Sequence, residues 1–97
     1  MKGRVFYEIC FFMNEVFLIG RLIENVEFDF IINSKKYKSI ARMKIETLDK
    51  QYINIITYDF LADFAYSKIK KLDYVFINGF LCEDYVIVKI LKNLTKN

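Results

Sequence analysis

The sequence predicts a mostly β domain with one helix inserted after its third strand. Three observations lead to this prediction. Apolar and polar side chains alternate with a period of two along most of the chain, as in half-buried strands. In a single stretch after residue 59, the apolar residues instead recur every three or four positions, as on one face of a helix. The 97 residues are 55% hydrophobic and contain no proline and three glycines, so they can build the core of one domain.

The first predicted strand begins at Val16 and continues to Ile32, past a bend near residues 24–25. Its segment Val16–Leu22 is too continuously apolar for an exposed edge strand. Gly20 lies inside this segment, where it predicts a bulge or a tight bend. A strand needs such a bend when it curls to close a barrel.

Four further strands are expected, and each is bounded by turn residues or by the helix. Between the first two strands, the turn residues are Asn33-Ser34-Lys35-Lys36. The expected strands are Tyr37–Thr47, Gln51–Tyr58, Tyr74–Leu81 and Tyr85–Leu91.

The helix is predicted over Phe60–Leu72, because Leu61, Phe64, Ala65, Ile69 and Leu72 fall on one helical stripe. Asp59 is suited to the N-cap position. Three lysines, which suit the negative end of the helix dipole, are expected in the last turn: Lys68, Lys70 and Lys71. Five strands with a helix between the third and the fourth is the layout of an OB-fold, a five-stranded Greek-key barrel.

The chain divides into an N-terminal extension at residues 1–12 and one domain at residues 13–97. The extension is apolar and is expected to form an extra edge strand or to be a start-site extension, since Met13 is a plausible initiator. It contains Glu8 and lacks a cleavage pattern for secretion, and no apolar run reaches the roughly 18 residues that span a bilayer. A cytoplasmic protein without a membrane partner is expected.

Residue types that support catalysis or metal binding are scarce. The chain has no histidine, so the usual proton shuttle at neutral pH is missing and a zinc site is not expected. Cys10 and Cys82 lie far apart and are expected to be buried free thiols in a reducing cytosol. The twelve Asp and Glu residues form no recognisable motif. We therefore expect neither an enzyme nor a cofactor.

Five segments, in order, resemble the bacterial single-stranded DNA-binding proteins (the SSB family). The first is Met13-Asn14-Glu15-Val16-Phe17-Leu18-Ile19-Gly20-Arg21-Leu22, which is similar to the family's opening strand. The others are Ser39–Thr47, Tyr52–Tyr58, Leu61–Ala65 followed by Ile69-Lys70-Lys71, and Val75–Leu81. The resemblance covers about residues 13–91 and implies an OB-fold that binds single-stranded DNA in replication, recombination or repair.

The resemblance also implies a homodimer or a homotetramer, in which the first strand and the sheet faces form contacts. Replication or recombination proteins are further expected partners. The family usually ends in a long tail with an acidic tip, whereas this chain stops at Lys92-Asn93-Leu94-Thr95-Lys96-Asn97. Its predicted hairpin turns are also shorter than the family's loops. The chain therefore resembles a short form of the family.

Strand alternation places cations and aromatic rings together on one face of the second and third strands. Ala41, Met43, Ile45, Ile53 and Ile55 are expected to point inward. Stacking on bases and contacts with phosphates are how proteins bind single strands. The predicted nucleic-acid-binding residues are Lys36, Lys38, Arg42, Lys44, Tyr52, Asn54 and Tyr58.

Each of these residues has a simpler interpretation that the sequence leaves open. Tyr52 and Tyr58 are also suited to core or interface packing, and Arg42 and Lys44 to an ordinary solvated strand face. Lysines such as Lys38 also protect edge strands from aggregation. The net charge of +3 is compatible with a polyanionic partner and does not require one. An OB module for protein assembly, with weak or no nucleic-acid binding, is therefore the alternative function.

Overall fold

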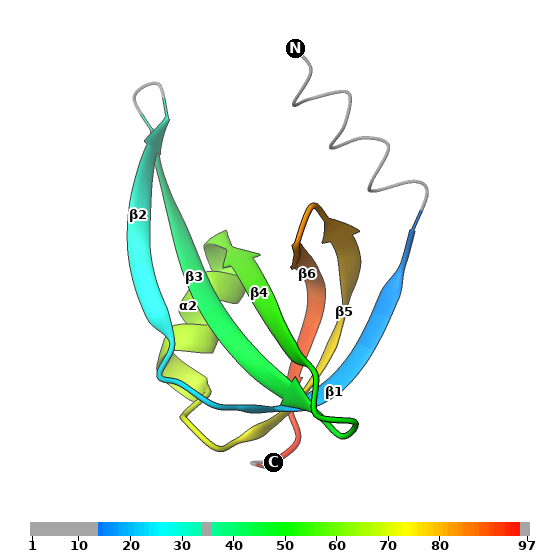
Figure 1. The fold of residues 1–97 in the computed structure, drawn as a ribbon. Helices are drawn as coiled ribbons and strands as arrows, with labels where there is room; N and C mark the ends of the chain where they lie inside the picture. Colours follow the sequence, from blue (N-terminus) through cyan, green and yellow to red (C-terminus); the bar gives the residue numbers. More distant parts are fainter. Residues whose placement is uncertain (1–13, 34–35, 96–97) are drawn as a thin grey trace.

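The computed structural model describes residues 14–33 and 36–95. In these residues the chain forms six strands and one helix (Figure 1). The elements are β1 (Val16–Leu22), β2 (Glu27–Asn33), β3 (Lys36–Thr47), β4 (Tyr52–Tyr58), α2 (Asp59–Lys68), β5 (Tyr74–Cys82) and β6 (Tyr85–Asn93).

Five of the strands close into a barrel, in the order β1-β5-β6-β4-β3 and back to β1. The β4–β6 pairing is parallel and the other pairings are antiparallel. The strand β2 pairs with β3 and forms with it the long hairpin on the left of Figure 1. The helix lies between β4 and β5, which are the third and fourth strands of the barrel in chain order. The predicted OB-fold is thereby confirmed.

The prediction of one continuous first strand is wrong in its detail, because the structure divides it into β1 and β2. Both strands pair with β3 one after the other: Leu22 lies opposite Ile45 and Glu27 lies opposite Arg42. Residues 23–26 therefore face only two residues of β3. The Ile23 N–H still donates to the Lys44 carbonyl (3.1 Å), and the chain bulges away from the sheet after it. The bend itself falls where the sequence predicts it.

Gly20 lies where β1 changes partners. It is paired with Thr47 of β3 on one side and with Val75 of β5 on the other. A Cβ atom at this position would lie 2.9 Å from the carbonyl oxygen of Glu46 and 2.9 Å from Cδ1 of Ile45. The absence of a side chain lets the strands approach where the barrel closes. Both ladders run through Gly20 without a register shift, so the bulge that the sequence predicts there is absent.

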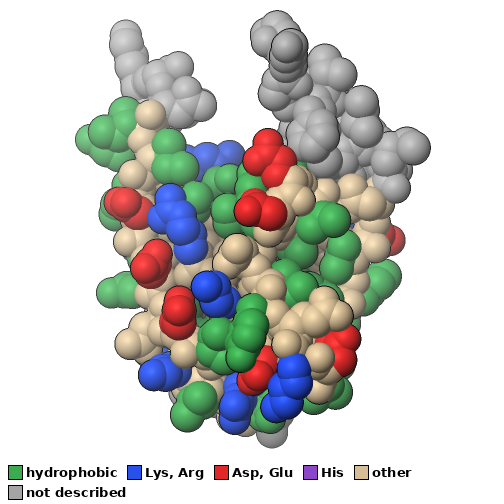
Figure 2. All heavy atoms as spheres, in the orientation of Figure 1, with side chains coloured by type: hydrophobic (Ala, Val, Ile, Leu, Met, Phe, Trp, Pro, Cys, Tyr) green, Lys and Arg blue, Asp and Glu red, His purple; other side chains and the backbone are tan. Residues whose placement is uncertain are grey.

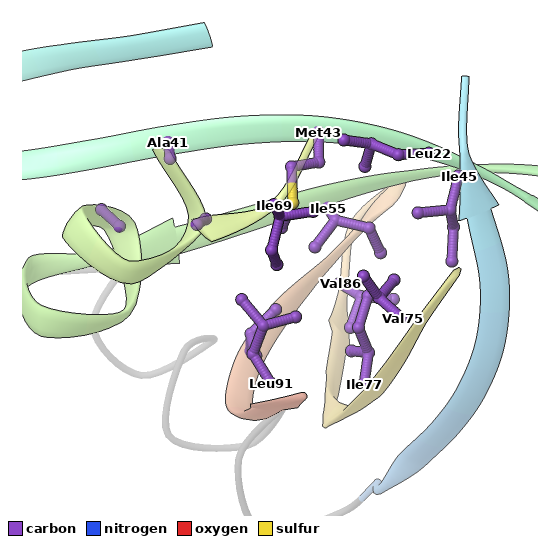
Figure 3. Packing of buried hydrophobic residues seen from close by; sticks show 13 residues of the cluster. Leu22, Ala41, Met43, Ile45, Ile55, Ile69, Val75, Ile77, Val86 and Leu91 are labelled. Carbon is purple, nitrogen blue, oxygen red and sulfur yellow. The ribbon is translucent and has the colours of Figure 1, made fainter. Parts of the chain in front are cut away.

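The core fills the barrel with side chains from every barrel strand and from the end of the helix. Figure 3 shows them pointing toward one another. The expected inward face of β3 is confirmed, because Ala41, Met43 and Ile45 are buried. In β4, Ile55 is fully buried and Ile53 packs against the same cluster. Alternation therefore leaves the other face of β3 and β4 outside the barrel.

The helix is shorter than predicted. It ends at Lys68, so Lys70 and Lys71 lie outside its last turn, and Ile69 is already extended. The reason is tertiary: the Leu72 N–H donates to the Leu22 carbonyl (2.8 Å), and the Leu22 N–H donates to the Asp73 carbonyl (2.9 Å). These bonds tie the segment after the helix to β1 and prevent another helical turn.

The expected N-cap is also wrong. Asp59 is the first helical residue, and Tyr58 occupies the N-cap position without a side-chain capping bond. Asp59 has a φ of 54°, a left-handed conformation in which the chain turns sharply from β4 into α2. The helix then covers one end of the barrel, where Ala62 and Ala65 are buried.

The remaining predictions concern cysteines, metals and the N-terminal extension. Cys82 is a buried free thiol, whereas Cys10 and the extension at residues 1–12 lie outside the described residues. Within residues 14–33 and 36–95, no three metal-ligating side chains come together. In the same part of the chain, no helix has the length and apolarity to cross a membrane.

Candidate nucleic-acid interface

The outward face of β3 and β4 carries most of the predicted binding residues. The register of the two strands places Lys44 opposite Asn54, and Glu46 opposite Tyr52. Lys38 and Arg42 point to the same side as Lys44, and Tyr58 to the same side as Asn54. Along a strand, residues separated by an even number of positions share a face. We call this surface the outward face. The side chain of Lys36 lies outside the described residues.

Arg42 and Lys44 are the two cations at the centre of the outward face. Arg42 is exposed and Lys44 is half-buried. Glu27 is paired directly with Arg42 across the β2–β3 ladder. Among the described residues, however, no carboxylate forms a salt bridge with either cation. Both positive charges can therefore meet a phosphate without first breaking an ion pair.

Lys38 differs from Arg42 and Lys44, because its ammonium interacts with Tyr58 and Asp59. Its ammonium lies 5.1 Å from the centroid of the Tyr58 ring and 3.8 Å from Oδ2 of Asp59. A cation over a ring face is attracted by the ring's quadrupole, and at exposed sites the gain is about 0.5–1 kcal/mol. A base that stacks on this side of Tyr58 must displace Lys38.

The two predicted stacking residues thus differ in accessibility. Tyr52 is 64% exposed and lies next to the β3–β4 turn. Tyr58 is half-buried and packs against a small outer cluster of Phe80, Cys82 and Ile87. The two tyrosines are separated by about 20 Å along the strand. The Tyr52 ring is therefore accessible for stacking without rearrangement, whereas the Tyr58 ring also packs against the outer cluster.

A hollow of about 340 Å³ lies on the outward face between these tyrosines. The structure brings together Arg42, Lys44 and Asn54 there, but it places Lys38, Tyr52 and Tyr58 outside the lining. Figure 2 shows basic, acidic and apolar side chains interleaved on the side of the molecule that includes β3 and β4. The lining consists of Glu24, Asn25, Glu27, Arg42, Met43, Lys44, Asn54, Ile55, Ile56 and Tyr85.

Tyr85 is the aromatic residue of the hollow that the sequence analysis missed. The parallel β4–β6 pairing sets it beside Asn54, and no local pattern indicates a pairing between segments that distant. Its side chain is half-buried. Burial raises the pKa of Tyr85 above its ordinary value of 10.0, and Cys82, Tyr58 and Glu83 raise it further. The phenol therefore stays protonated at neutral pH and keeps a hydrogen-bond donor.

Glu24 and Glu27 were also missed as members of the site. They belong to the bulge and to the first residue of β2, which the sequence analysis treated as part of one continuous strand. Because the chain leaves the sheet after Ile23, Glu24 and Asn25 form, with Glu27, a wall beside Arg42 and Lys44. The interface is therefore mixed in charge, and not simply basic.

A second surface, on β1 and β5, is apolar. Phe17 is 64% exposed, Ile19 is exposed, and the Phe17 and Phe76 rings are 6.4 Å apart. With Leu48 from the β3–β4 turn they line a shallow hollow of about 410 Å³. We call this surface the β1–β5 face. Phe80 of β5 does not belong to this face, because it is only 2% exposed and lies in the outer cluster.

Aromatic side chains also gather on the opposite side of the β2–β3 hairpin. Phe28 stacks on Tyr66 of the helix, with 4.8 Å between ring centroids, and meets Phe30 edge-on at 5.3 Å. Tyr66 is 56% exposed, about as much as Tyr52. It lies on the other side of the hairpin from Arg42, because Phe28 and Glu27 alternate along β2.

Solved structures with this architecture include several single-stranded DNA-binding proteins. The protein from Thermus aquaticus has a TM-score of 0.73 and 20% identity, over 88% of this chain and 42% of that one. The SSB domain from Synechococcus sp. has a TM-score of 0.71 and 14% identity, over 84% and 96%. The small single-stranded DNA-binding protein from Streptomyces coelicolor has a TM-score of 0.59 and 12% identity, over 87% and 95%.

This chain thus spans less than half the length of the Thermus protein and nearly the whole Synechococcus domain. No family model and no curated protein matches the sequence. At identities of 20% and below, the likeness concerns the backbone and not the binding residues. The barrel order, the helix between β4 and β5, and these structures together show that the chain has the OB-fold of the single-stranded DNA-binding proteins.

Proposed function

We propose that the chain is a member of the SSB family, which binds single-stranded DNA on the outward face. The observation that carries the proposal is the pair of cations Arg42 and Lys44, which form no salt bridge among the described residues, near an exposed ring at Tyr52. Bases stack on aromatic side chains and phosphates pair with cations, and this combination tolerates many sequences. Proteins with the same fold are named for this activity.

In this proposal, the strand crosses β3 and β4 from Tyr52 toward Tyr58. Tyr52 stacks on one base, Arg42 and Lys44 pair with phosphates, and Asn54 hydrogen-bonds a base or a sugar. Lys38 then leaves Tyr58 for a phosphate and frees that ring for a second base. Lys36 extends the basic path along β3. Two or three stacked bases with a similar number of phosphate contacts give roughly micromolar binding per protomer.

The role belongs to DNA replication, recombination or repair, in the cytoplasm, and requires no catalysis. The alternative, an assembly module that does not bind nucleic acid, is favoured by one observation: Glu24 and Glu27 lie in the hollow beside the cations. Direct binding measurements separate the two functions.

The first prediction concerns stacking on Tyr52. A labelled oligothymidine should bind the chain with roughly micromolar affinity in fluorescence anisotropy, and Tyr52→Ala should weaken binding by about five- to a hundredfold, the loss of one stacked base. Tyr66→Ala is the matched control, because Tyr66 is similarly exposed on the other side of the hairpin. Equal affinities for all three proteins would remove Tyr52 from the site, and no binding by any of them would support the assembly alternative.

The second prediction concerns phosphate contacts. The logarithm of the binding constant falls linearly with the logarithm of the salt concentration. On single strands, each phosphate that a cation neutralises makes this slope steeper by about 0.7. Arg42→Ala and Lys44→Ala should each flatten the slope by about that amount, and the double variant by about 1.4. Lys68→Ala, an exposed lysine of α2, should leave the slope unchanged. A slope that does not respond to the double variant would show that phosphates do not contact these cations.

We also propose that the chain forms a homodimer or homotetramer through the β1–β5 face. Soluble monomers rarely expose contiguous apolar patches above a few hundred Å², and Phe17, Ile19 and Phe76 lie side by side here. The partners on this face are copies of the same chain, and replication or recombination proteins bind elsewhere.

Assembly is tested by sedimentation. The wild-type chain should sediment as a dimer or tetramer, whereas Phe17→Asp should shift it to a monomer, because a buried unpaired carboxylate costs several kcal/mol. Phe60→Asp is the control, since Phe60 is 77% exposed at the start of α2, away from this face. A monomeric wild type, or a Phe17→Asp variant that still assembles, would contradict the proposal.

A further inference from the structure

The hollow on the outward face has two walls of different chemistry. Tyr85 stands on one side, at the beginning of β6, and Glu24, Asn25 and Glu27 stand on the other. The floor between them carries Arg42, Lys44 and Asn54. A site that only attracted phosphates would gain nothing from carboxylates beside its cations, since they lower the local positive potential. The acidic wall therefore indicates a ligand group other than phosphate.

The volume of the hollow is sufficient for one nucleobase. Tyr85 belongs to β6 and Glu27 to β2, which β3 and β4 separate, so these two backbones are at most about 14 Å apart. The Tyr85 and glutamate side chains reach into that gap from both sides. The volume of about 340 Å³ is at the lower end of the range for small-molecule sites.

The carboxylates on the acidic wall are free to accept hydrogen bonds. Although Glu27 is paired with Arg42 in the β2–β3 register, neither Glu24 nor Glu27 forms a salt bridge among the described residues. An ionised carboxylate is only an acceptor, with two oxygens available. It can accept from the exocyclic amino group of cytosine, but the corresponding position of thymine is a carbonyl oxygen, which it repels.

We propose that this hollow is a nucleobase subsite that prefers cytosine over thymine, with Glu27 and Glu24 reading the amino group. A base stacks against Tyr85, its amino edge faces the acidic wall, and Arg42 and Lys44 hold the flanking phosphates. The inference rests on the proposed single-strand binding and adds a base preference to it. It also explains why the acidic residues lie inside the site.

The test compares oligocytidine and oligothymidine of equal length, at one salt concentration and at a mildly alkaline pH that keeps oligocytidine unfolded. The wild-type chain should bind oligocytidine about fivefold tighter or more, the discrimination expected from one good pair of contacts between a side chain and a base. Glu27→Gln should bring the ratio of the two affinities close to one, because the Gln amide can also donate to the thymine carbonyl. It should tighten oligothymidine binding, because a negative charge is removed.

Asp29→Asn is the matched control. Asp29 is the next residue of β2 on the outward face and lies outside the hollow, opposite Ile40. Removing its charge should tighten both oligonucleotides by the same factor and leave their ratio unchanged. Because the variants are compared by this ratio, differences between the two free oligonucleotides cancel.

The outcomes are separable. Equal wild-type affinities, a thymine preference, or a Glu27→Gln ratio that matches the wild type would overturn the base subsite while the proposed function stands. If neither oligonucleotide binds, the proposed function itself fails. A ratio that changes for Glu27→Gln and not for Asp29→Asn supports the subsite.

Discussion

The antiparallel register between β3 and β4 is the constraint on which the rest of the structure depends. It sets Met43 opposite Ile55, inside the barrel, and Lys44 opposite Asn54, outside it. A slip of one residue would exchange the two faces of either strand and bury a lysine in the core. The energy of burying the isoleucines therefore also fixes where the cations lie. Stability and the proposed binding surface have one physical origin.

Local periodicity predicts most of the strands and the inward and outward faces of β3 and β4, and the layout of the elements with the resemblance to the SSB family predicts the barrel. Periodicity fails where long-range contacts decide the local structure. The helix stops at Lys68 because Leu72 and Asp73 bond to β1, and no feature of residues 60–72 reveals that partner. The first strand is interrupted because its bulge leaves the sheet beside β3. Such effects are not visible in a pattern of neighbouring residues.

The same limit applies to the candidate site. Arg42, Lys44 and Asn54 were predicted together, because alternation within two adjacent strands places them on one face. Tyr85 comes from a strand about thirty residues further along the chain and joins them through a parallel pairing. Glu24 and Glu27 join through the bulge. The candidate site consequently contains two acidic residues and one aromatic residue that the sequence does not indicate.

The central claim is that single-stranded DNA lies on the outward face and not on the β1–β5 face. Amide chemical shifts of the ¹⁵N-labelled chain, recorded during titration with an oligonucleotide, test it residue by residue. The account predicts that the largest changes occur at Arg42, Lys44 and Asn54, with Phe17 and Phe76 little affected. Changes concentrated at Phe17 and Phe76, with β3 and β4 silent, would contradict it.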